Sequence, residues 1–133
     1  MIILDTHVLI WWVNADKRLS KKAMSAIKKE LNNENGEILI SSISAWEVAM
    51  LVEKERISLT MNVDDWLETV AEIEAVKFIP INNTIAVQSV ALPGNFHSDP
   101  ADRMIAALSR HLAIPVVTAD EKIQKYKHVK TIW

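Results

Sequence analysis

The sequence contains no cysteine, only two glycines and no long apolar run. Without cysteine there are no disulfides and no thiolate metal sites, which fits a protein of a reducing compartment. No apolar run reaches the roughly 18 residues that a membrane-spanning helix needs, and no basic segment precedes the first apolar run, so we expect no secretory signal. These absences predict a cytoplasmic protein without a membrane partner.

The chain also lacks an excess of positive charge, because 15 lysines and arginines face 17 acids and give a net charge of −2. This balance argues mildly against a general nucleic-acid coat protein. It does not exclude a nuclease, because an acidic cluster that holds a metal lowers the formal sum. The 133 residues, half of them apolar and free of repeats or linkers, predict a single domain over residues 1–133.

Short apolar segments alternate with amphipathic ones along the chain. We expect strands at residues 2–4, 38–40, 78–79, 115–117 and 129–133, and helices at residues 19–31, 44–55, 63–73, 84–92 and 100–112. Strands that alternate with helices favour a parallel sheet with right-handed crossovers. The sequence therefore predicts a three-layer α/β domain, with a central, mostly parallel sheet flanked by helices and a helical arm over about residues 44–73.

Four acids occupy similar places, each near the start of a helix that follows a strand or loop: Asp5, Glu47, Asp102 and Asp120. Parallel strands deliver their C-terminal ends to one edge of the sheet, where open α/β folds place their sites. Carboxylates gathered there repel each other and are costly to desolvate unless a cation lies among them. Hard oxygen ligands of this kind suit Mg²⁺ or Mn²⁺.

Taken singly, two of these acids also have a structural interpretation as helix-start residues. Residues 44–47 spell a capping box, in which Glu47 bonds back to the first amide of its helix. Asp99 before Pro100 is typical of an N-cap followed by a first helical residue. Asp102 then falls in the first turn, where the helix dipole favours a negative charge.

The other two acids differ in how well they suit capping. Thr118 or Asp120 would suit the cap of the last helix. Asp5 directly follows an apolar strand, and Thr6 is the better-placed cap, so a pure capping role for Asp5 is less natural. The joint pattern of four such acids favours a metal site over four separate caps.

Four segments carry a family resemblance: Leu-Asp-Thr-His-Val-Leu-Ile-Trp-Trp at residues 4–12, Ser-Ala-Trp-Glu-Val at 44–48, His-Ser-Asp-Pro-Ala-Asp-Arg-Met-Ile-Ala-Ala at 97–107 and Val-Thr-Ala-Asp at 117–120. With these segments in this order over nearly the whole chain, the sequence resembles PIN-domain proteins, and among them the VapC-type toxins of type II toxin–antitoxin systems. The Asp-Pro-x-Asp-Arg piece at residues 99–103 is the most specific part.

The resemblance implies that Asp5, Glu47, Asp102 and Asp120 are the catalytic, metal-binding acids of a Mg²⁺- or Mn²⁺-dependent endoribonuclease, with Asp99 as an additional acid of less certain role. It also implies an RNA substrate, a cognate antitoxin and a homodimer. In such a site a cation activates water and offsets charge on the phosphate, and no side chain acts as nucleophile. Hydrolysis would leave a 5′-phosphate and a 3′-hydroxyl.

Three further residues beside the acids are possible supports of the site. The hydroxyls of Thr6 and Thr118 stand next to acids, where they would orient a carboxylate or a water, with helix capping as the stronger alternative. Arg103 follows Asp102 and either contacts a phosphate or forms an ion pair that holds an acid such as Asp99. His7 and His97 also lie beside the acids, but Mg²⁺ prefers oxygen ligands.

The tryptophans and a basic stretch raise weaker expectations. Trp11 and Trp12 are adjacent on a helix, so we expect one to be packed and the other to lie at an interface or groove. Trp46 and Trp66 are expected in the core or at a subunit contact. The basic residues within 17–29 are expected to be solvated surface, with contact to an RNA backbone as the alternative.

Two other functions compete with the nuclease. One is a non-catalytic regulatory module that binds metal or RNA through the acid-lined site. The other is phosphotransfer on an aspartate after the first strand, which expects a second acid two residues on, where this chain has His7. Phosphotransfer also leaves Glu47 and Asp102 unexplained.

Overall fold

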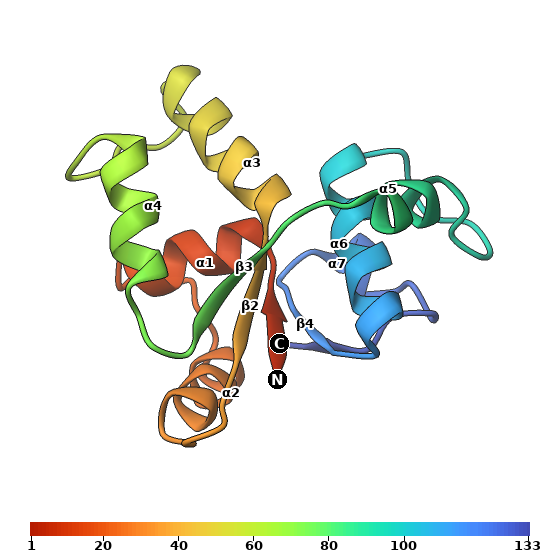
Figure 1. Ribbon diagram of the computed structural model, residues 1–133, viewed down its shortest axis with the longest axis horizontal. Helices are drawn as coiled ribbons and strands as arrows, with labels where there is room; N and C mark the ends of the chain where they lie inside the picture. Colours follow the sequence, from red (N-terminus) through yellow and green to blue (C-terminus); the bar gives the residue numbers. More distant parts are fainter.

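The computed structural model describes residues 1–133 and contains a five-stranded sheet between two groups of helices (Figure 1). All neighbouring strands are parallel, in the order β3-β2-β1-β4-β5. The strands are β1 Ile2–Leu4, β2 Ile38–Ser41, β3 Val76–Ile79, β4 Val116–Val117 and β5 Thr131–Ile132. The predicted α/β class with a central parallel sheet is confirmed.

Seven helices connect the strands: α1 Thr6–Val13, α2 Lys21–Leu31, α3 Ser42–Glu53, α4 Val63–Ala71, α5 Asn83–Val90, α6 Pro100–Leu112 and α7 Glu121–Gln124. In Figure 1, α3 and α4 project beside the sheet and form the predicted helical arm. None of these helices has the length and apolar character needed to cross a membrane.

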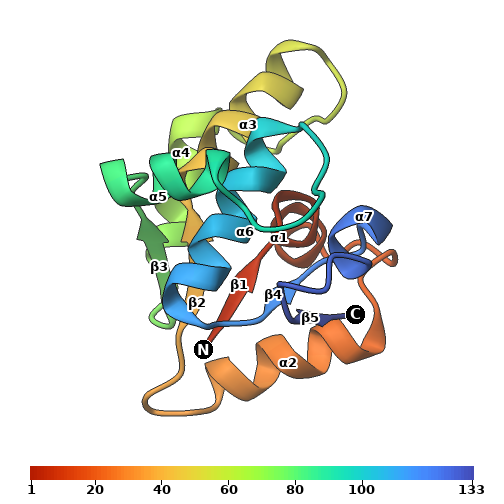
Figure 2. The same cartoon turned by 90° about the vertical axis from the view of Figure 1, so that its right-hand side faces the viewer.

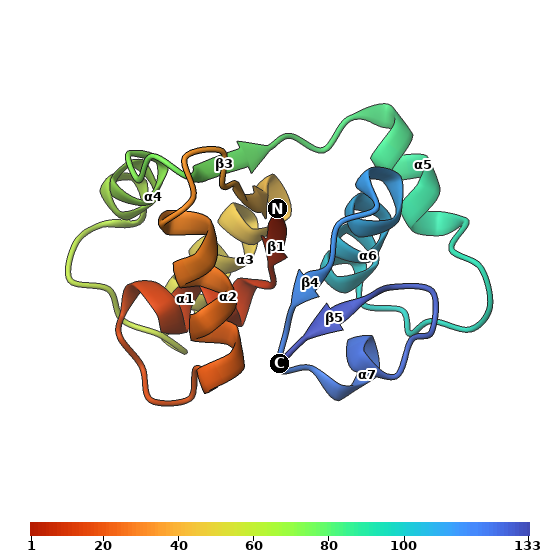
Figure 3. The same ribbon diagram turned by 90° about the horizontal axis from the view of Figure 1, so that it is seen from below.

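Alternating apolar residues give the sheet a core on each face. Ile2 and Leu4 of β1 pack into the cluster that includes α1, α2, α3 and α4, whereas Ile3 points into the cluster that includes α5 and α6. Figure 3 shows these two helix groups on opposite sides of the strands. Because successive side chains of a strand point to opposite faces, the fully apolar strands β1 and β4 suit a sheet that is covered on both sides.

The start of α3 differs from the predicted position. The helix begins at Ser42, with Ser41 as the N-cap, whose side chain accepts a hydrogen bond from the amide of Ile43 at 3.2 Å. The predicted capping box at residues 44–47 is therefore wrong, because both ends of that tetrapeptide already lie inside the helix. Glu47 lies in the second turn of α3 and is free for another role.

The tryptophan expectations are corrected in part. Trp66 is in the core, with 3% of its surface exposed, whereas Trp46 is 56% exposed, so its predicted place in the core is wrong and its predicted subunit contact stays a prediction. Trp11 and Trp12 are both partly buried against the first core cluster, so burial does not separate a packed ring from one at an interface or groove. Trp133 covers part of Trp11, with 5.9 Å between ring centroids.

Candidate active site

Strand register brings Asp5 to the C-terminal edge of the sheet beside Thr118. Leu4 is paired with Val117, and the amide of Asp5 donates to the carbonyl of Val117 at 3.1 Å. The Thr118 hydroxyl then donates to Oδ2 of Asp5 at 2.7 Å, while the Thr6 amide donates to Oδ1 at 2.8 Å. Asp5 is thus the N-cap of α1, and the expectation that Thr6 is the cap is wrong.

Thr6 connects the first strand to the arm. Its hydroxyl donates to Oε1 of Glu47 at 2.5 Å, and its oxygen lies 2.8 Å from the Oγ of Ser44. Because the Thr6 proton is given to Glu47, Ser44 is the donor in the second contact. Ser44 was not singled out from the sequence as a site residue, although a serine one helical turn before Glu47 is placed to reach the same partners.

The start of α6 contributes two acids and a histidine neighbour. Asp99 is the N-cap and accepts a hydrogen bond from the amide of Asp102 at 3.0 Å, as the sequence predicted. Oδ2 of Asp102 lies 3.0 Å from Nε2 of His97, but the two atoms are not aligned for a hydrogen bond. Nε2 is buried and has no other partner, so His97 rests against the carboxylate without neutralising it through a formed hydrogen bond.

Asp120 completes the arrangement from the other side of the sheet edge. Its Oδ1 accepts a hydrogen bond from the amide of Lys122 at 2.7 Å, which makes it the N-cap of α7. Its own amide donates to Oγ1 of Thr118 at 3.0 Å. Thr118 therefore joins the carboxylate of Asp5 to the backbone of Asp120 through one hydroxyl, and it orients the Asp5 carboxylate where the sequence had favoured a helix cap.

Mutual repulsion shows that the acids lie near one another. Burial, together with the charges of Asp5, Asp99, Asp120 and Glu47, raises the pKa of Asp102 from 3.8 to about 8. Burial also raises the pKa of Glu47, and the charges of Asp5 and Asp99 raise it further, while the hydrogen bond from Thr6 lowers it. Burial raises the pKa of Asp5 as well, although its two hydrogen bonds oppose the change.

Arg103 does not form the predicted ion pair with an acid, and its contact with a phosphate stays a prediction. Its guanidinium donates to four backbone carbonyls, those of Ser89 at 2.8 Å, Phe96 at 3.0 Å, and His97 and Val90 at 3.2 Å each. Its Nε, Nη1 and Nη2 atoms all donate to these carbonyls. A planar fork with five donors can bind several carbonyls at once, and here it fastens the segment before α6 to that helix.

A divalent cation fits the donor chemistry of this edge. The acids Asp5, Glu47, Asp102 and Asp120 offer carboxylate oxygens, which are the ligands that Mg²⁺ and Mn²⁺ prefer. The raised pKa values mean that the cluster resists carrying its full negative charge alone. As the side chains stand, no three His, Asp or Glu residues converge closely enough to hold one ion, so binding requires the carboxylates to move together.

A model of the PIN domain family matches residues 2–129 of the chain, so the chain belongs to the PIN domain family. It is also 37% identical over 134 residues to Ribonuclease VapC22 of Mycobacterium tuberculosis (strain ATCC 25618 / H37Rv), an alignment that covers 99% of this chain and 98% of that protein. This similarity places it among the VapC-type PIN toxins.

Solved structures agree with the fold. The chain is similar to VapBC2 from Rickettsia felis bound to a promoter DNA fragment, with a TM-score of 0.69, 17% identity and 98% and 97% of the two chains covered. It is also similar to a toxin–antitoxin complex from Klebsiella pneumoniae, with a TM-score of 0.66, 20% identity and 97% and 95% coverage. At these identities the likeness concerns the fold.

Proposed function

We propose that the protein is a Mg²⁺- or Mn²⁺-dependent endoribonuclease that acts as the toxin of a toxin–antitoxin pair in the cytoplasm. The observation that carries the proposal is the gathering of Asp5, Glu47, Asp102 and Asp120 at one edge of the sheet, with the pKa of Asp102 raised to about 8. The ribonuclease name of the relative at 37% identity supports the same activity.

The four acids would hold the cation, and the surrounding threonines would keep them in place. When bound, the cation lowers the pKa of a coordinated water and offsets the charge that builds on the phosphate. Thr118 fixes Asp5 from one side and Thr6 fixes Glu47 from the other, so two of the carboxylates are oriented before substrate arrives. In this proposal the attacking group is a water, and the hydroxyls of Thr6 and Thr118 serve to orient Glu47 and Asp5.

Incubation of the purified protein with RNA, with and without Mg²⁺, tests the activity. Metal-dependent cleavage with 5′-phosphate and 3′-hydroxyl ends supports hydrolysis by an activated water. Ends with a cyclic phosphate would mean that the ribose hydroxyl attacks, which excludes the proposed chemistry. RNA binding without cleavage in either metal would favour the regulatory module, and transfer of a phosphoryl group to Asp5 would favour phosphotransfer.

The antitoxin and a homodimer form the second half of the proposal. The solved structures similar to this chain include toxin–antitoxin complexes, and tryptophan is enriched among residues that dominate binding energy at interfaces. Trp46 is exposed and stands beside Glu47, which makes it a better anchor than Trp11 or Trp12. Replacing Trp46 by Ala should weaken binding of the cognate antitoxin by about 2 kcal/mol in a titration, and sedimentation of the free protein tests the homodimer.

A further inference from the structure

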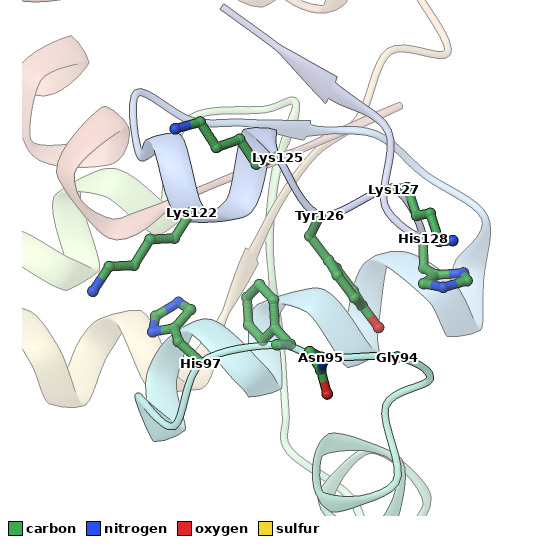
Figure 4. Close-up of a pocket in the computed structure, with 9 residues that line it drawn as sticks. Gly94, Asn95, His97, Lys122, Lys125, Tyr126, Lys127 and His128 are labelled. Atoms are coloured by element: carbon green, nitrogen blue, oxygen red, sulfur yellow. The ribbon is translucent and has the colours of Figure 1, made fainter.

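A basic pocket lies next to the acidic cluster and is separate from it. Its volume is about 500 Å³, and it is bounded by residues 94–97 before α6 and by residues 122–128 in and after α7. Figure 4 shows Lys122 and His97 toward one end and Lys127 and His128 toward the other, with Tyr126 between them. None of the residues that line it is acidic, although acids outnumber bases in the chain as a whole.

His97 connects this pocket to the acids. It lines the pocket, and its Nε2 lies 3.0 Å from Oδ2 of Asp102. A polyanion that enters the acidic edge at one phosphate must have its flanking phosphates accommodated by cations, because carboxylates repel them. Lys122 and Lys127 form no ion pair with an acid, so both positive charges remain available to a ligand.

Several contacts fix the two segments that form the walls of the pocket. Gly94 has a φ of +66°, and a Cβ at this position would come within 3.4 Å of Nε2 of His128, so a residue other than glycine would be strained there. Arg103 binds the carbonyls of Phe96 and His97 and holds the same wall from behind. The hydroxyl of Tyr126 donates to the carbonyl of Pro93 at 2.5 Å, which closes the opposite wall onto this segment.

The shape and the rings favour a single strand over a duplex. Phe96 is partly exposed and packs on the buried Tyr126, with 4.6 Å between ring centroids, so Phe96 gives the pocket an aromatic side as well as a basic one. A concave pocket with an aromatic ring accepts an unstacked base, whereas a duplex keeps its bases inside. Basic grooves combined with aromatic rings are the usual means of binding single-stranded nucleic acid.

We propose that the pocket between residues 94–97 and 122–128 is a subsite for single-stranded RNA, in which Lys122 and Lys127 contact phosphates that flank the phosphodiester at the acids. The proposal rests on the ribonuclease function proposed above and adds the path of the strand to it. The RNA leaves the acidic edge past His97 and runs along α7, and the aromatic side of the pocket receives one base.

Binding of a fluorescein-labelled single-stranded RNA of about 12 nucleotides and mixed sequence, measured in EDTA over a series of salt concentrations, tests the subsite. The pocket variant is Lys122→Gln/Lys127→Gln. Its matched control is Lys28→Gln/Lys29→Gln, which removes the same charge from the exposed end of α2. In Figure 2 that helix lies across the molecule from the start of α6.

The pocket variant should bind about tenfold more weakly at roughly 0.1 M salt, and its salt slope should fall by about 1.4, because each lost phosphate contact removes about 0.7 for a single strand. The control should stay within about twofold of the wild type, since counterion release requires contact. Equal losses in both variants, no loss in the pocket variant, or no binding by the wild type would each overturn the subsite.

A crosslinking experiment locates the strand independently. RNA that carries 4-thiouridine should crosslink to peptides containing residues 94–97 or 122–128, and crosslinks confined to α2 would refute the proposal. Binding in EDTA does not depend on catalysis. If the wild type cleaves RNA but the pocket variant binds and cleaves normally, only the subsite fails; if RNA binds at the pocket but is never cleaved, only the nuclease function fails.

Discussion

Two carboxylates at the same edge of the sheet are held in opposite ways. Asp5 is only 6% exposed, and both of its oxygens accept hydrogen bonds, from the Thr6 amide and the Thr118 hydroxyl. The side chain of Asp102 accepts no aligned hydrogen bond, lies 3.0 Å from Nε2 of His97 and has its pKa raised to about 8. The fold fixes the carboxylate of Asp5, whereas burial and neighbouring acids oppose the negative charge of Asp102.

The difference indicates a division of work within the site. Hydrogen bonds to Asp5 fix its direction in advance, which is what a metal ligand gains from its outer partners. The charge of Asp102 is opposed by burial first and then by four other acids, so in the proposed metal site a cation would relieve more repulsion there than at Asp5. In that proposal Asp5 would be the fixed ligand, and Asp102 would be the group whose charge depends on the cation.

The largest effect expected is the loss of cleavage in Asp5→Asn and in Asp102→Asn. Each should lose about a thousandfold in kcat/KM, equivalent to roughly 4 kcal/mol of transition-state stabilisation, because a ligand charge disappears. Their stabilities should differ. Without metal, Asp102→Asn should melt at a higher temperature than the wild type, whereas Asp5→Asn should stay close to it, because asparagine also caps helices well.

Initial cleavage rates in Mg²⁺ measure activity and thermal melts in EDTA measure stability, with Asp64→Asn in the first turn of α4 as the control acid. That variant should cleave normally. Normal metal-dependent cleavage by Asp5→Asn would remove Asp5 from the site. A large drop in its melting temperature would instead show that the acid is mainly structural.

A pH dependence of stability follows from the raised pKa of Asp102. Because the folded protein holds this proton up to a pH of about 8 and the unfolded chain releases it near 3.8, the native state binds more protons between these values. The stabilisation is complete below the unfolded pKa and is lost as pH rises through the folded one. In EDTA, the stability of the wild type relative to Asp102→Asn should fall as pH rises from about 4 to about 8.

Melts of the two proteins over this pH range, repeated with Mg²⁺, provide the measurement. Mg²⁺ should raise the melting temperature of the wild type most at high pH, where the carboxylate is free of its proton to bind it. A difference between the two proteins that does not change with pH would show that Asp102 is ionised throughout and that repulsion at the site is weak.

The sheet and the positions of the acids follow from features that the sequence displays. Residues 2–4 and 38–40 are continuous apolar runs, and acids or helix starts follow them at fixed places, so both the parallel sheet and its C-terminal edge were predictable. The hydrogen bonds that link Thr6 to Ser44 and Glu47 were not predictable, because these two residues lie about forty positions away in sequence. Only the packing of α3 against α1 brings them to Thr6.

Arg103 shows the limit of reading a residue from its neighbours in the sequence. Adjacency to Asp102 suggested an ion pair or a phosphate, but side chains at successive helix positions point in different directions. The guanidinium instead meets carbonyls at the end of α5 and in the segment that follows it. The local sequence does not show that these carbonyls lack backbone partners, because they lack them only as a result of the irregular path of residues 91–99.

Arg103 fixes the segment before α6, at whose start Asp102 lies, so removing Arg103 tests how Asp102 is positioned. Arg103→Ala leaves four carbonyls without their donor and should cost about 2–4 kcal/mol of unfolding free energy. Arg103→Lys should recover only part of the loss, because an ammonium cannot reproduce the planar fork. Urea denaturation measures both variants, and Arg110→Ala, which removes one hydrogen bond to the carbonyl of His128, is a suitable control. If Arg103→Ala loses no more unfolding free energy than Arg110→Ala, the segment between α5 and α6 does not depend on Arg103 for its stability.

Removing the support behind Asp5 and Glu47 should cost activity more than stability. Thr118→Val keeps the shape but removes the hydroxyl that joins Asp5 to Asp120, and Thr6→Val removes the donor to Glu47. Loss of such an outer partner costs roughly 10- to 100-fold in metal affinity or activity. Mg²⁺ titrations of the cleavage rate measure the effect, and Thr6→Ser should restore it. If both valine variants require the same Mg²⁺ concentration as the wild type, the threonine hydroxyls are not needed to orient the carboxylates.

The smallest effect separates Asp99 from Asp102, three residues apart at the start of α6. Asp99→Ala removes the N-cap that accepts the amide of Asp102, and this should cost about 0.5–2 kcal/mol of stability. Because the charge of Asp99 also contributes to the raised pKa of Asp102, the variant should bring that pKa closer to its usual value. Asp99→Asn keeps the cap and removes only the charge, so it should melt like the wild type while showing the same change in pKa. Cleavage by both should remain within about tenfold of the wild type, as expected for a residue that acts through position and charge. If the two variants lose activity as completely as Asp102→Asn without a change in melting temperature, Asp99 is itself a ligand, and the two ends of this turn act on the metal together.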